Sequence, residues 1–252
     1  MTGNTEKVLV EACVDSVASA LAAERGGARR LELCDNLFDG GTTPSAGMMS
    51  AVKAAVHIPV FVIVRPRGGG FVYTYDEMSV MRLDIEAARM LGADGVVVGV
   101  LTRDARVDAA QLRTLVETAG DLPVTFHRAF DLTQDRDQAL EILMQTGVTR
   151  VLTSGGAPSA LEGVAAIHAL VRRAAGQMEI MAGGGVREET VQEIVHRAGV
   201  REVHVRGTRP AGTAMAGGQA NIRLRKALPE DEGTWEETDE RRIREFVRLA
   251  NG

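Results

Sequence analysis

A short phrase that occurs four times constrains the fold of this chain more than any other feature. Each copy has a glycine, a small apolar residue, two turn residues and then alternating apolar positions, and the copies span residues 27–33, 92–98, 147–153 and 199–205. Each copy follows an amphipathic segment, at residues 17–25, 81–91, 138–146 and 190–198. The pattern predicts a helix that ends on a left-handed glycine and leads through a tight turn into a strand.

Four further strands are expected between these copies, at residues 8–13, 59–64, 123–128 and 179–182. Two of them begin with proline, Pro59 and Pro123, which is tolerated at the first residue of a strand. Eight strands that alternate with helices are expected to be parallel, because crossover connections are right-handed. The 252-residue length then fits one TIM (β/α)8 barrel. A doubly wound sheet is the alternative, but it does not explain the fourfold repetition.

The repeat also predicts which side chains face the barrel interior. The fourth and sixth residues after each glycine are apolar in all but one case and should pack against the helices. The fifth and seventh residues should point inward, and the same alternation applies to the other strands. The expected inward positions that carry polar or sulfur-containing side chains are Glu11, Cys13, Glu32, Cys34, Arg65, Thr125, His127, Ser154, His204 and Arg206. They gather toward the carboxyl ends of the strands, where barrel enzymes carry their sites.

The last part of the chain differs from the barrel core, which we expect over about residues 8–206. Residues 207–237 are rich in Gly, Ala, Thr and charge and have no clear period, which favours an irregular surface arm, a lid or a subunit contact. Residues 238–249 predict an amphipathic closing helix with Ile243, Phe246, Val247 and Leu249 on its apolar face. We expect a single domain.

Charge and cysteine content exclude several classes of function. A net charge of −5 and a pI near 5.6 argue against broad binding to nucleic acid or acidic lipid. Two cysteines cannot form a disulfide framework, and residues 1–7 lack the apolar stretch of a signal peptide. The longest apolar runs are too short to span a bilayer. We therefore expect a soluble protein of a reducing compartment, with no membrane or nucleic-acid partner.

Arginines and glycines at strand ends predict binding of an anion. Arg65 and Arg67 precede three glycines and form a plausible receptor for a carboxylate or phosphate. Alternatively, Arg65 neutralises Glu11 or Glu32 inside the barrel. Loops after the last two strands often hold phosphate in this architecture, and the second set of predicted anion-binding residues is Ser154, Gly183, Gly184, His204 and Arg206. The glycines there alternatively serve only as turns.

Two acids and a histidine are candidates for proton transfer. Glu11 and Glu32 lie at matching heights of the repeat on neighbouring strands and suit either an acid–base pair or a structural ion-pair network. His127 can move protons or bind metal, although an inward histidine that bonds to a neighbouring acid is the commoner case. His204 has the same two interpretations. Arg128 should point outward and is left outside the site.

Cys13 and Cys34 form a candidate metal site. Each lies two residues after an inward glutamate, so both should face the interior on adjacent strands. Strands pair about 4.8 Å apart, near the separation of about 4.6 Å that two metal–thiolate bonds of ~2.3 Å imply. Barrel shear alternatively lengthens this separation. Thiolates select soft ions such as Cu(I), whereas buried cysteines otherwise act as small hydrophobes. No CxxC, HExxH, GxSxG or Walker sequence occurs.

Several phrases together resemble the CutC copper-homeostasis family, from about residue 8 to residue 204. They are Glu32-Leu33-Cys34, Asp39-Gly40-Gly41-Thr42-Thr43-Pro44-Ser45, Arg65-Pro66-Arg67-Gly68-Gly69, Val124-Thr125-Phe126-His127-Arg128-Ala129-Phe130-Asp131, Val151-Leu152-Thr153-Ser154-Gly155, Ile180-Met181-Ala182-Gly183-Gly184-Gly185-Val186 and Glu202-Val203-His204. The resemblance implies a TIM barrel, a cytoplasmic location, a homodimer or higher homo-oligomer, and a role in copper handling. It also implies that Cys13 and Cys34 bind the copper. Residues 206–235 resemble the family poorly.

Three functions therefore follow from the sequence. The first is copper homeostasis through Cu(I) held by the buried thiol pair Cys13 and Cys34. The alternative is an enzyme of lyase or isomerase type, acting on a small anionic metabolite with Glu11, Glu32 and His127 as catalytic residues. Fold alone does not choose a reaction. The third is a non-catalytic oligomeric partner, which predicts an exposed apolar patch on the closing helix or the arm.

Overall fold

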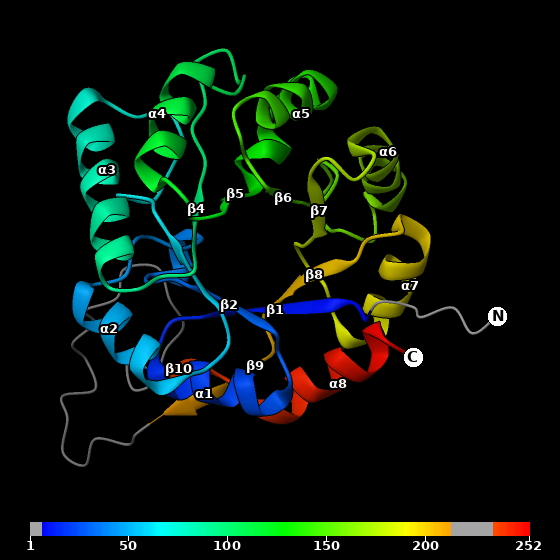
Figure 1. Cartoon of the computed structure of the whole chain (residues 1–252). Coiled ribbons are helices and arrows are strands. Elements are labelled where there is room, and N and C mark those ends of the chain that lie inside the picture. The colour runs from blue at the N-terminus through cyan, green and yellow to red at the C-terminus, as the bar shows by residue number, and fades with distance from the viewer. Residues whose placement is uncertain (1–6, 213–233) are drawn as a thin grey trace, which may run out of the picture.

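Eight parallel strands close into a barrel in chain order in this computed structural model, which describes residues 7–212 and 234–252 (Figure 1). The strands are β1 (Leu9–Val14), β2 (Arg30–Leu33), β3 (Val60–Ile63), β4 (Gly95–Val98), β5 (Val124–Phe126), β6 (Arg150–Thr153), β7 (Glu179–Ala182) and β8 (Glu202–Val205). Because β1 pairs with both β2 and β8, the sheet has no free edge. The TIM barrel is confirmed, and a doubly wound sheet is excluded because such a sheet is open.

Helices surround the barrel and connect successive strands. They are α1 (Val17–Gly26), α2 (Ala46–Ala55), α3 (Tyr75–Met90), α4 (Ala109–Ala119), α5 (Arg136–Gln145), α6 (Val164–Ala174) and α7 (Glu188–Ala198), with short 3-10 turns η1 (Leu37–Asp39) and η2 (Arg128–Leu132). Gly27 and Gly199 cap α1 and α7 in the left-handed conformation, as the repeat predicts. Helix α3 begins six residues before the expected start, because Thr74 and Glu77 form a capping box there.

The alternation of side chains along the strands separates two apolar clusters. The larger cluster lies between barrel and helices and includes Leu31, Leu33, Val96 and Val98. The smaller cluster lies within the barrel and contains Cys13, Cys34, Phe61, Ile63 and Val97. The predicted facing of these strand residues is therefore confirmed. No helix among the described residues is long and apolar enough to cross a membrane.

A buried layer of charges fills the barrel below the smaller cluster. Arg30 donates hydrogen bonds to Glu11 and Glu202, and Arg150 donates to Glu202 at 3.0 Å. The Phe61 ring lies 5.1 Å from the Arg30 guanidinium. The structural ion-pair network expected for Glu11 is thus present, but its cation is Arg30 rather than Arg65. The alternation of side chains along β2 also points Arg30 into the barrel. The sequence pattern therefore indicated that Arg30 could pair with an inward acid.

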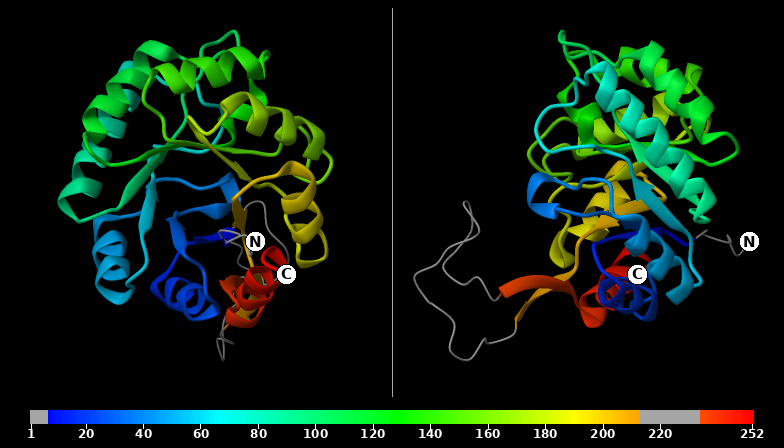
Figure 2. Two further views of the ribbon diagram at one scale, coloured as in Figure 1. Left: turned by 45° about the vertical axis from the view of Figure 1, so that its right-hand side comes forward. Right: turned by 90° about the vertical axis from the view of Figure 1, so that its left-hand side faces the viewer.

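The predicted irregular arm begins and ends in regular structure. β9 (Thr208–Gly212) pairs antiparallel with β10 (Thr234–Thr238), and the ribbon stands out from the barrel in Figure 2. The prediction of irregular structure was wrong for residues 208–212 and 234–237. These two strands form by pairing with each other across a long stretch of sequence, so no local periodicity of apolar residues marks them. Residues 213–233 of the arm lie outside the described residues. The closing helix is confirmed as α8 (Glu240–Ala250), with Ile243 and Phe246 buried.

Candidate functional site

A cavity of about 480 Å³ opens at the carboxyl ends of the barrel strands. Its lining includes Cys13 from β1, Glu32 from β2, and Cys34, His127 and His204 from the strand ends around the ring. A larger hollow of about 720 Å³ lies between α1 and the start of α8, and no cysteine or histidine lines it. The mouth of the barrel is therefore where the predicted chemistry converges.

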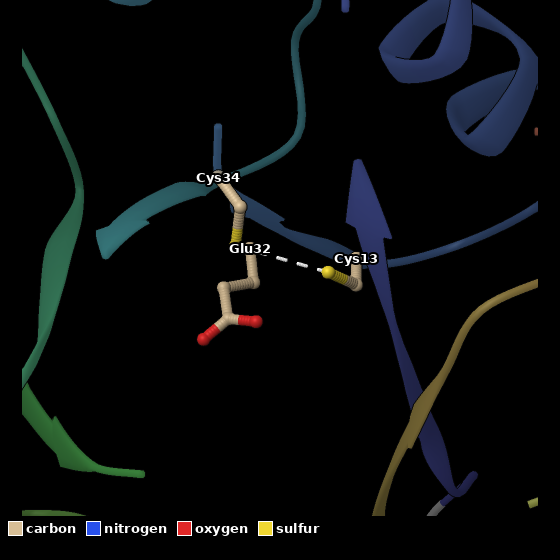
Figure 3. A group of neighbouring side chains, drawn as sticks. All are labelled: Cys13, Glu32 and Cys34. Atoms are coloured by element: carbon tan, nitrogen blue, oxygen red, sulfur yellow. Dashed lines mark hydrogen bonds between the residues drawn. The ribbon is translucent and has the colours of Figure 1, made fainter. Parts of the chain in front are cut away.

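The two sulfur atoms meet on one wall of this cavity. Cys13 Sγ lies 3.8 Å from Cys34 Sγ, and both residues are buried. A carboxylate oxygen of Glu32 and the two sulfurs all lie within 4.8 Å of one another, and Figure 3 shows the three side chains gathered between β1 and β2. The three atoms form a group of the size that a metal ion requires.

Barrel shear sets which residues lie level with one another. Cys13 is the register partner of Glu32, and Glu11 is the partner of Arg30 on one side and of His204 on the other. Glu11 and Glu32 are therefore offset by two residues, and the prediction that they lie at matching heights was wrong. The physical reason is the stagger that a closed barrel requires between neighbouring strands. Glu11 does not line the cavity, whereas Glu32 does.

His204 bridges the two offset glutamates. Its Nδ1 lies 2.8 Å from Glu11 Oε1, and its Nε2 lies 3.6 Å from Glu32 Oε2. Burial opposes the charged form, but Glu32, Cys13 and Glu11 raise the pKa of His204 well above its usual value. This places an imidazolium between the two acids at neutral pH.

The two glutamates have opposite protonation states. Burial would raise the pKa of Glu11, but Arg30 and His204 lower it to about 2. Burial raises the pKa of Glu32 to about 8, against the attraction of His204. At neutral pH Glu11 is therefore ionised, and Glu32 carries a proton that it can release near the physiological range.

The thiol pair shares one proton at neutral pH. The hydrogen bond from Cys34 lowers the pKa of Cys13 to about 5, although burial opposes this shift. The same bond, together with burial, raises the pKa of Cys34 well above its usual value. Cys13 is thus a thiolate that accepts a hydrogen bond from the Cys34 thiol. The thiolate is the form in which cysteine binds metals.

Arg65 enters the cavity wall from the end of β3. Its guanidinium donates to the backbone carbonyls of Asp39, Gly41 and Gly69, with distances of 2.8 Å for the last two. Arg65 is only 4% exposed, and its Nε has no hydrogen-bond partner in the part of the chain that the structure describes. The alternative in which Arg65 neutralises Glu11 or Glu32 was wrong: among the described residues the Arg65 guanidinium donates to backbone carbonyls and pairs with no carboxylate.

His127 lies beside Arg65 at the end of β5. Its Nδ1 accepts a hydrogen bond from the Ala129 N–H at 3.1 Å, so the ring proton resides on Nε2. Burial and the neighbouring Arg65 lower the pKa of His127 to about 3, which keeps the ring neutral. Nε2 has no partner. The hydrogen bond to a neighbouring acid, expected as the commoner case for an inward histidine, is therefore not formed by His127 with any described residue.

Three of the predicted anion-binding residues lie outside the cavity lining. Arg67 donates to Glu77 at 3.2 Å and lies over the Tyr73 ring on the surface, because its strand has already ended. Ser154 is buried and bonds to Asp131 at 3.0 Å. Gly183 packs so tightly that a Cβ there would lie 2.4 Å from Leu152 Cδ1. Gly184 and Arg206 do line the cavity, as does His204.

Arg128 lines the cavity, although the strand alternation points it outward. The reason is that β5 ends at Phe126 and the turn η2 begins at Arg128, so the alternation no longer applies. Arg128 pairs with Asp131 at 2.8 Å and donates to Ser154 Oγ at 2.8 Å. Phe71, from the loop after β3, also lines the cavity, and no sequence pattern marked it.

The closed barrel makes this chain a (β/α)8-barrel protein. Its cavity, lined by polar side chains, lies at the carboxyl ends of the strands. The profile of the CutC family matches residues 8–209. The chain belongs to the CutC family.

Two curated relatives support this assignment over nearly the whole chain. The copper homeostasis protein cutC homolog of Mus musculus is 44% identical over 242 residues, which cover 96% of this chain and 89% of the relative. The homolog of Homo sapiens is 44% identical over 250 residues, with 98% and 91% covered.

Solved structures agree with the fold. A CutC crystal structure from Streptococcus agalactiae has a TM-score of 0.75 and 37% identity, and the match covers 78% of this chain and 97% of that one. The N-(5'-phosphoribosyl)anthranilate isomerase of Pyrococcus furiosus has a TM-score of 0.56 at 16% identity, over 96% and 98% of the two chains. The second likeness concerns the fold alone.

Proposed function

We propose that this chain serves copper homeostasis by binding Cu(I) between Cys13 and Cys34. The observation that carries the proposal is the sulfur separation of 3.8 Å on the wall of an open cavity. Cu(I) is a soft ion that prefers thiolate ligands, and Cys13 supplies one at neutral pH. The names of the mouse and human relatives, both copper homeostasis proteins, support the same function.

The spacing of the donors favours a bent site with a third ligand. Two collinear metal–thiolate bonds of ~2.3 Å would place the sulfurs about 4.6 Å apart, and the observed separation is shorter. An ion held by both sulfurs therefore lies off the line between them. Glu32, whose carboxylate oxygen lies within 4.8 Å of both sulfurs, is the neighbouring oxygen donor.

The test is a Cu(I) titration under reducing, anaerobic conditions against a competing chelator. We expect wild-type protein to bind one Cu(I) per chain, and the double variant Cys13→Ser/Cys34→Ser to lose this binding. Ile63→Val is the matched control, because Ile63 packs in the same buried cluster but offers no ligand atom. Equal binding by the wild type and the double variant would eliminate the thiol site.

The second candidate function is an enzyme of lyase or isomerase type that acts on a small anionic metabolite. The specific observation in its favour is Glu32, an acid with a pKa of about 8 that lines the cavity beside the protonated His204. A group that titrates near neutral pH suits proton abstraction and return. Glu11 would act through His204, which it holds at 2.8 Å, and His127 would contact the substrate.

Solvent exchange tests this enzyme candidate. Small carboxylic acids and sugar phosphates are incubated with the protein in D₂O, and NMR detects replacement of a carbon-bound proton. We expect catalysed exchange for a member of the panel, lost in Glu32→Gln and kept in Cys13→Ser/Cys34→Ser. Exchange that survives in Glu32→Gln contradicts the assigned role, and exchange of no compound contradicts the candidate.

We also propose that the chain works in the cytoplasm and self-associates. The exposed apolar side chains Tyr75, Leu83 and Met90 on α3 suit contact with a second copy of the chain. Sedimentation analysis of Leu83→Glu should show a smaller assembly than wild type, and an unchanged mass would contradict this contact.

The non-catalytic partner role predicts an apolar patch on α8 or the arm. Among the described residues of these two segments, only Trp235 is a large exposed hydrophobe.

A further inference from the structure

Arg65 and His127, two buried residues at the barrel mouth, both lie against the Phe71 ring. Arg65 is 4% exposed and His127 is 6% exposed, and both residues line the cavity. Neither Arg65 Nε nor His127 Nε2 has a hydrogen-bond partner among the described residues. Buried polar groups in folded proteins nearly always have one. A vacant pair of donors in a cavity therefore points to a ligand that supplies acceptors.

The positive charge of Arg65 indicates that the ligand is an anion. Three other arginines that line the cavity are paired with carboxylates: Arg128 with Asp131, Arg206 with Glu236, and Arg242 with Glu188. Arg187 also lines the cavity, but its side chain is exposed to solvent, whereas Arg65 is buried. Arg65 instead bonds to backbone carbonyls and has no carboxylate partner among the described residues. A buried cation without a counter-charge is costly. An anionic group beside Arg65 would supply that counter-charge.

Phe71 occupies the place where this anion would lie. The Arg65 guanidinium is 4.9 Å from the centre of the Phe71 ring, and the His127 ring is 4.8 Å from it. The face of an aromatic ring is electron-rich, so Phe71 is a weak acceptor for both groups. The ring follows Gly68, Gly69 and Gly70, and a Cβ at Gly70 would meet nothing within 4 Å. Phe71 itself is only partly buried, so its ring has a solvent-facing side toward which it can move.

We propose that Arg65 Nε and His127 Nε2 bind the carboxylate of a small organic acid, which displaces the Phe71 ring. Two donors match the two oxygens of a carboxylate, whereas a phosphate offers more acceptors than this pair satisfies. The ligand body would extend along the cavity toward Glu32. This proposal names a carboxylic acid as the substrate class of the enzyme candidate. A catalytic role for the subsite therefore rests on that candidate function.

Binding is measured by calorimetry with acetate, lactate, pyruvate and malonate, and with acetamide and inorganic phosphate as comparison compounds. We expect the protein to bind carboxylates and not acetamide or phosphate. His127→Phe keeps an aromatic ring but has no donor, and we expect about 10- to 100-fold weaker binding, the range for a lost hydrogen bond to a charged group. His127→Gln keeps an N–H donor and should bind within a few-fold of wild type.

Two further variants test the arginine and the ring. Arg197→Ala is the matched control, because Arg197 is an exposed arginine on α7 that does not line the cavity, and it should bind as wild type does. Phe71→Ala removes the competing ring and should bind carboxylates more tightly, by roughly 2- to 30-fold, which corresponds to the range of a cation–π contact. Arg65→Lys should weaken binding, and its fold is checked by circular dichroism because Arg65 also holds three loop carbonyls.

The proposal is overturned if phosphate binds and carboxylates do not, if nothing in the panel binds, or if His127→Phe binds as wild type does. These outcomes differ from failure of the enzyme candidate. Carboxylate binding with no exchange in D₂O leaves the subsite intact and removes the enzyme candidate. Exchange that is unaffected in His127→Phe removes both the subsite and the assigned role of His127, and leaves Glu32 as the proton-transferring group of the enzyme candidate. Copper binding at the thiol pair is measured independently of both.

Discussion

The ring of His127 fills the space beside Gly99, where any larger residue would carry its side chain. A Cβ on Gly99 would lie 2.1 Å from Cε1 and 2.4 Å from Nδ1 of that ring. The two residues follow neighbouring strands, β4 and β5, and both face the barrel interior. Glycine at position 99 thus permits the orientation in which His127 accepts a hydrogen bond from Ala129 and keeps Nε2 free for a ligand.

Replacement of Gly99 should therefore disturb both stability and binding. We expect Gly99→Ala to lower the free energy of unfolding by about 1–3 kcal/mol, the usual effect of overpacking a core. Carboxylate binding should weaken because the His127 ring moves. Urea unfolding and calorimetry measure the two effects. Gly47→Ala, in helix α2, is the control and should be slightly stabilising; equal stability of Gly99→Ala and wild type would contradict the close contact.

Loss of the Glu11 carboxylate should be strongly destabilising. Glu11→Gln leaves Arg30 with an incomplete set of counter-charges, and breaking a buried pair costs about 3–5 kcal/mol. The pKa of Glu11 is lowered from 4.5 to about 2, so its contribution is fully present above pH 4.5 and is lost as pH falls toward 2. Urea unfolding should show that the difference in the free energy of unfolding between Glu11→Gln and wild type shrinks as pH falls from 4.5 to 2.

An exposed ion pair provides the comparison for this variant. Glu193 pairs with Arg197 on the surface of α7, one helical turn away. Such pairs contribute about 0.3–0.5 kcal/mol, so Glu193→Gln should cost far less than Glu11→Gln. If Glu193→Gln and Glu11→Gln lowered the free energy of unfolding by similar amounts, the buried charges around Arg30 would not stabilise the fold more than a surface ion pair does.

Glu32 should reduce stability at neutral and higher pH. Its pKa rises from 4.5 to about 8 on folding, so the folded state holds a proton that the unfolded chain has released. The contribution of this group to the free energy of unfolding therefore falls as pH rises from 4.5 to 8 and is constant above that. Glu32→Gln lacks this loss, so its stability relative to wild type should increase across the interval. A pH-independent difference would contradict the raised pKa.

The thiol pair should hold a thiolate well below the pH at which free cysteine ionises. Because the pKa of Cys13 is about 5, ultraviolet absorbance should report one thiolate per chain at neutral pH and its loss below pH 5. Cys13→Ser should remove the signal. Cys34→Ala should move the midpoint upward, since the hydrogen bond from Cys34 is the main cause of the low pKa. An unchanged midpoint in Cys34→Ala would show that another group stabilises the thiolate.

Local sequence patterns were sufficient for the barrel and for much of its mouth. The glycine that ends a helix and the alternation of apolar residues act over a few neighbouring positions, so they predicted the strands, the inward facing of Cys13, Cys34 and His127, and the closing helix. The same alternation includes Arg30, which the site prediction left out. These features follow from backbone geometry that each segment carries with it.

Relationships between distant segments were decided only by the tertiary structure. Closing eight strands into a ring imposes a stagger, and this stagger places Glu11 level with His204 and Cys13 level with Glu32. Where the strands end, loop paths carry Arg128 into the cavity, leave Arg67 on the surface and bring Phe71 over Arg65. The pairing of β9 with β10 likewise joins segments that have no local period. Register and loop path depend on the whole ring at once, so no single stretch of sequence specifies them.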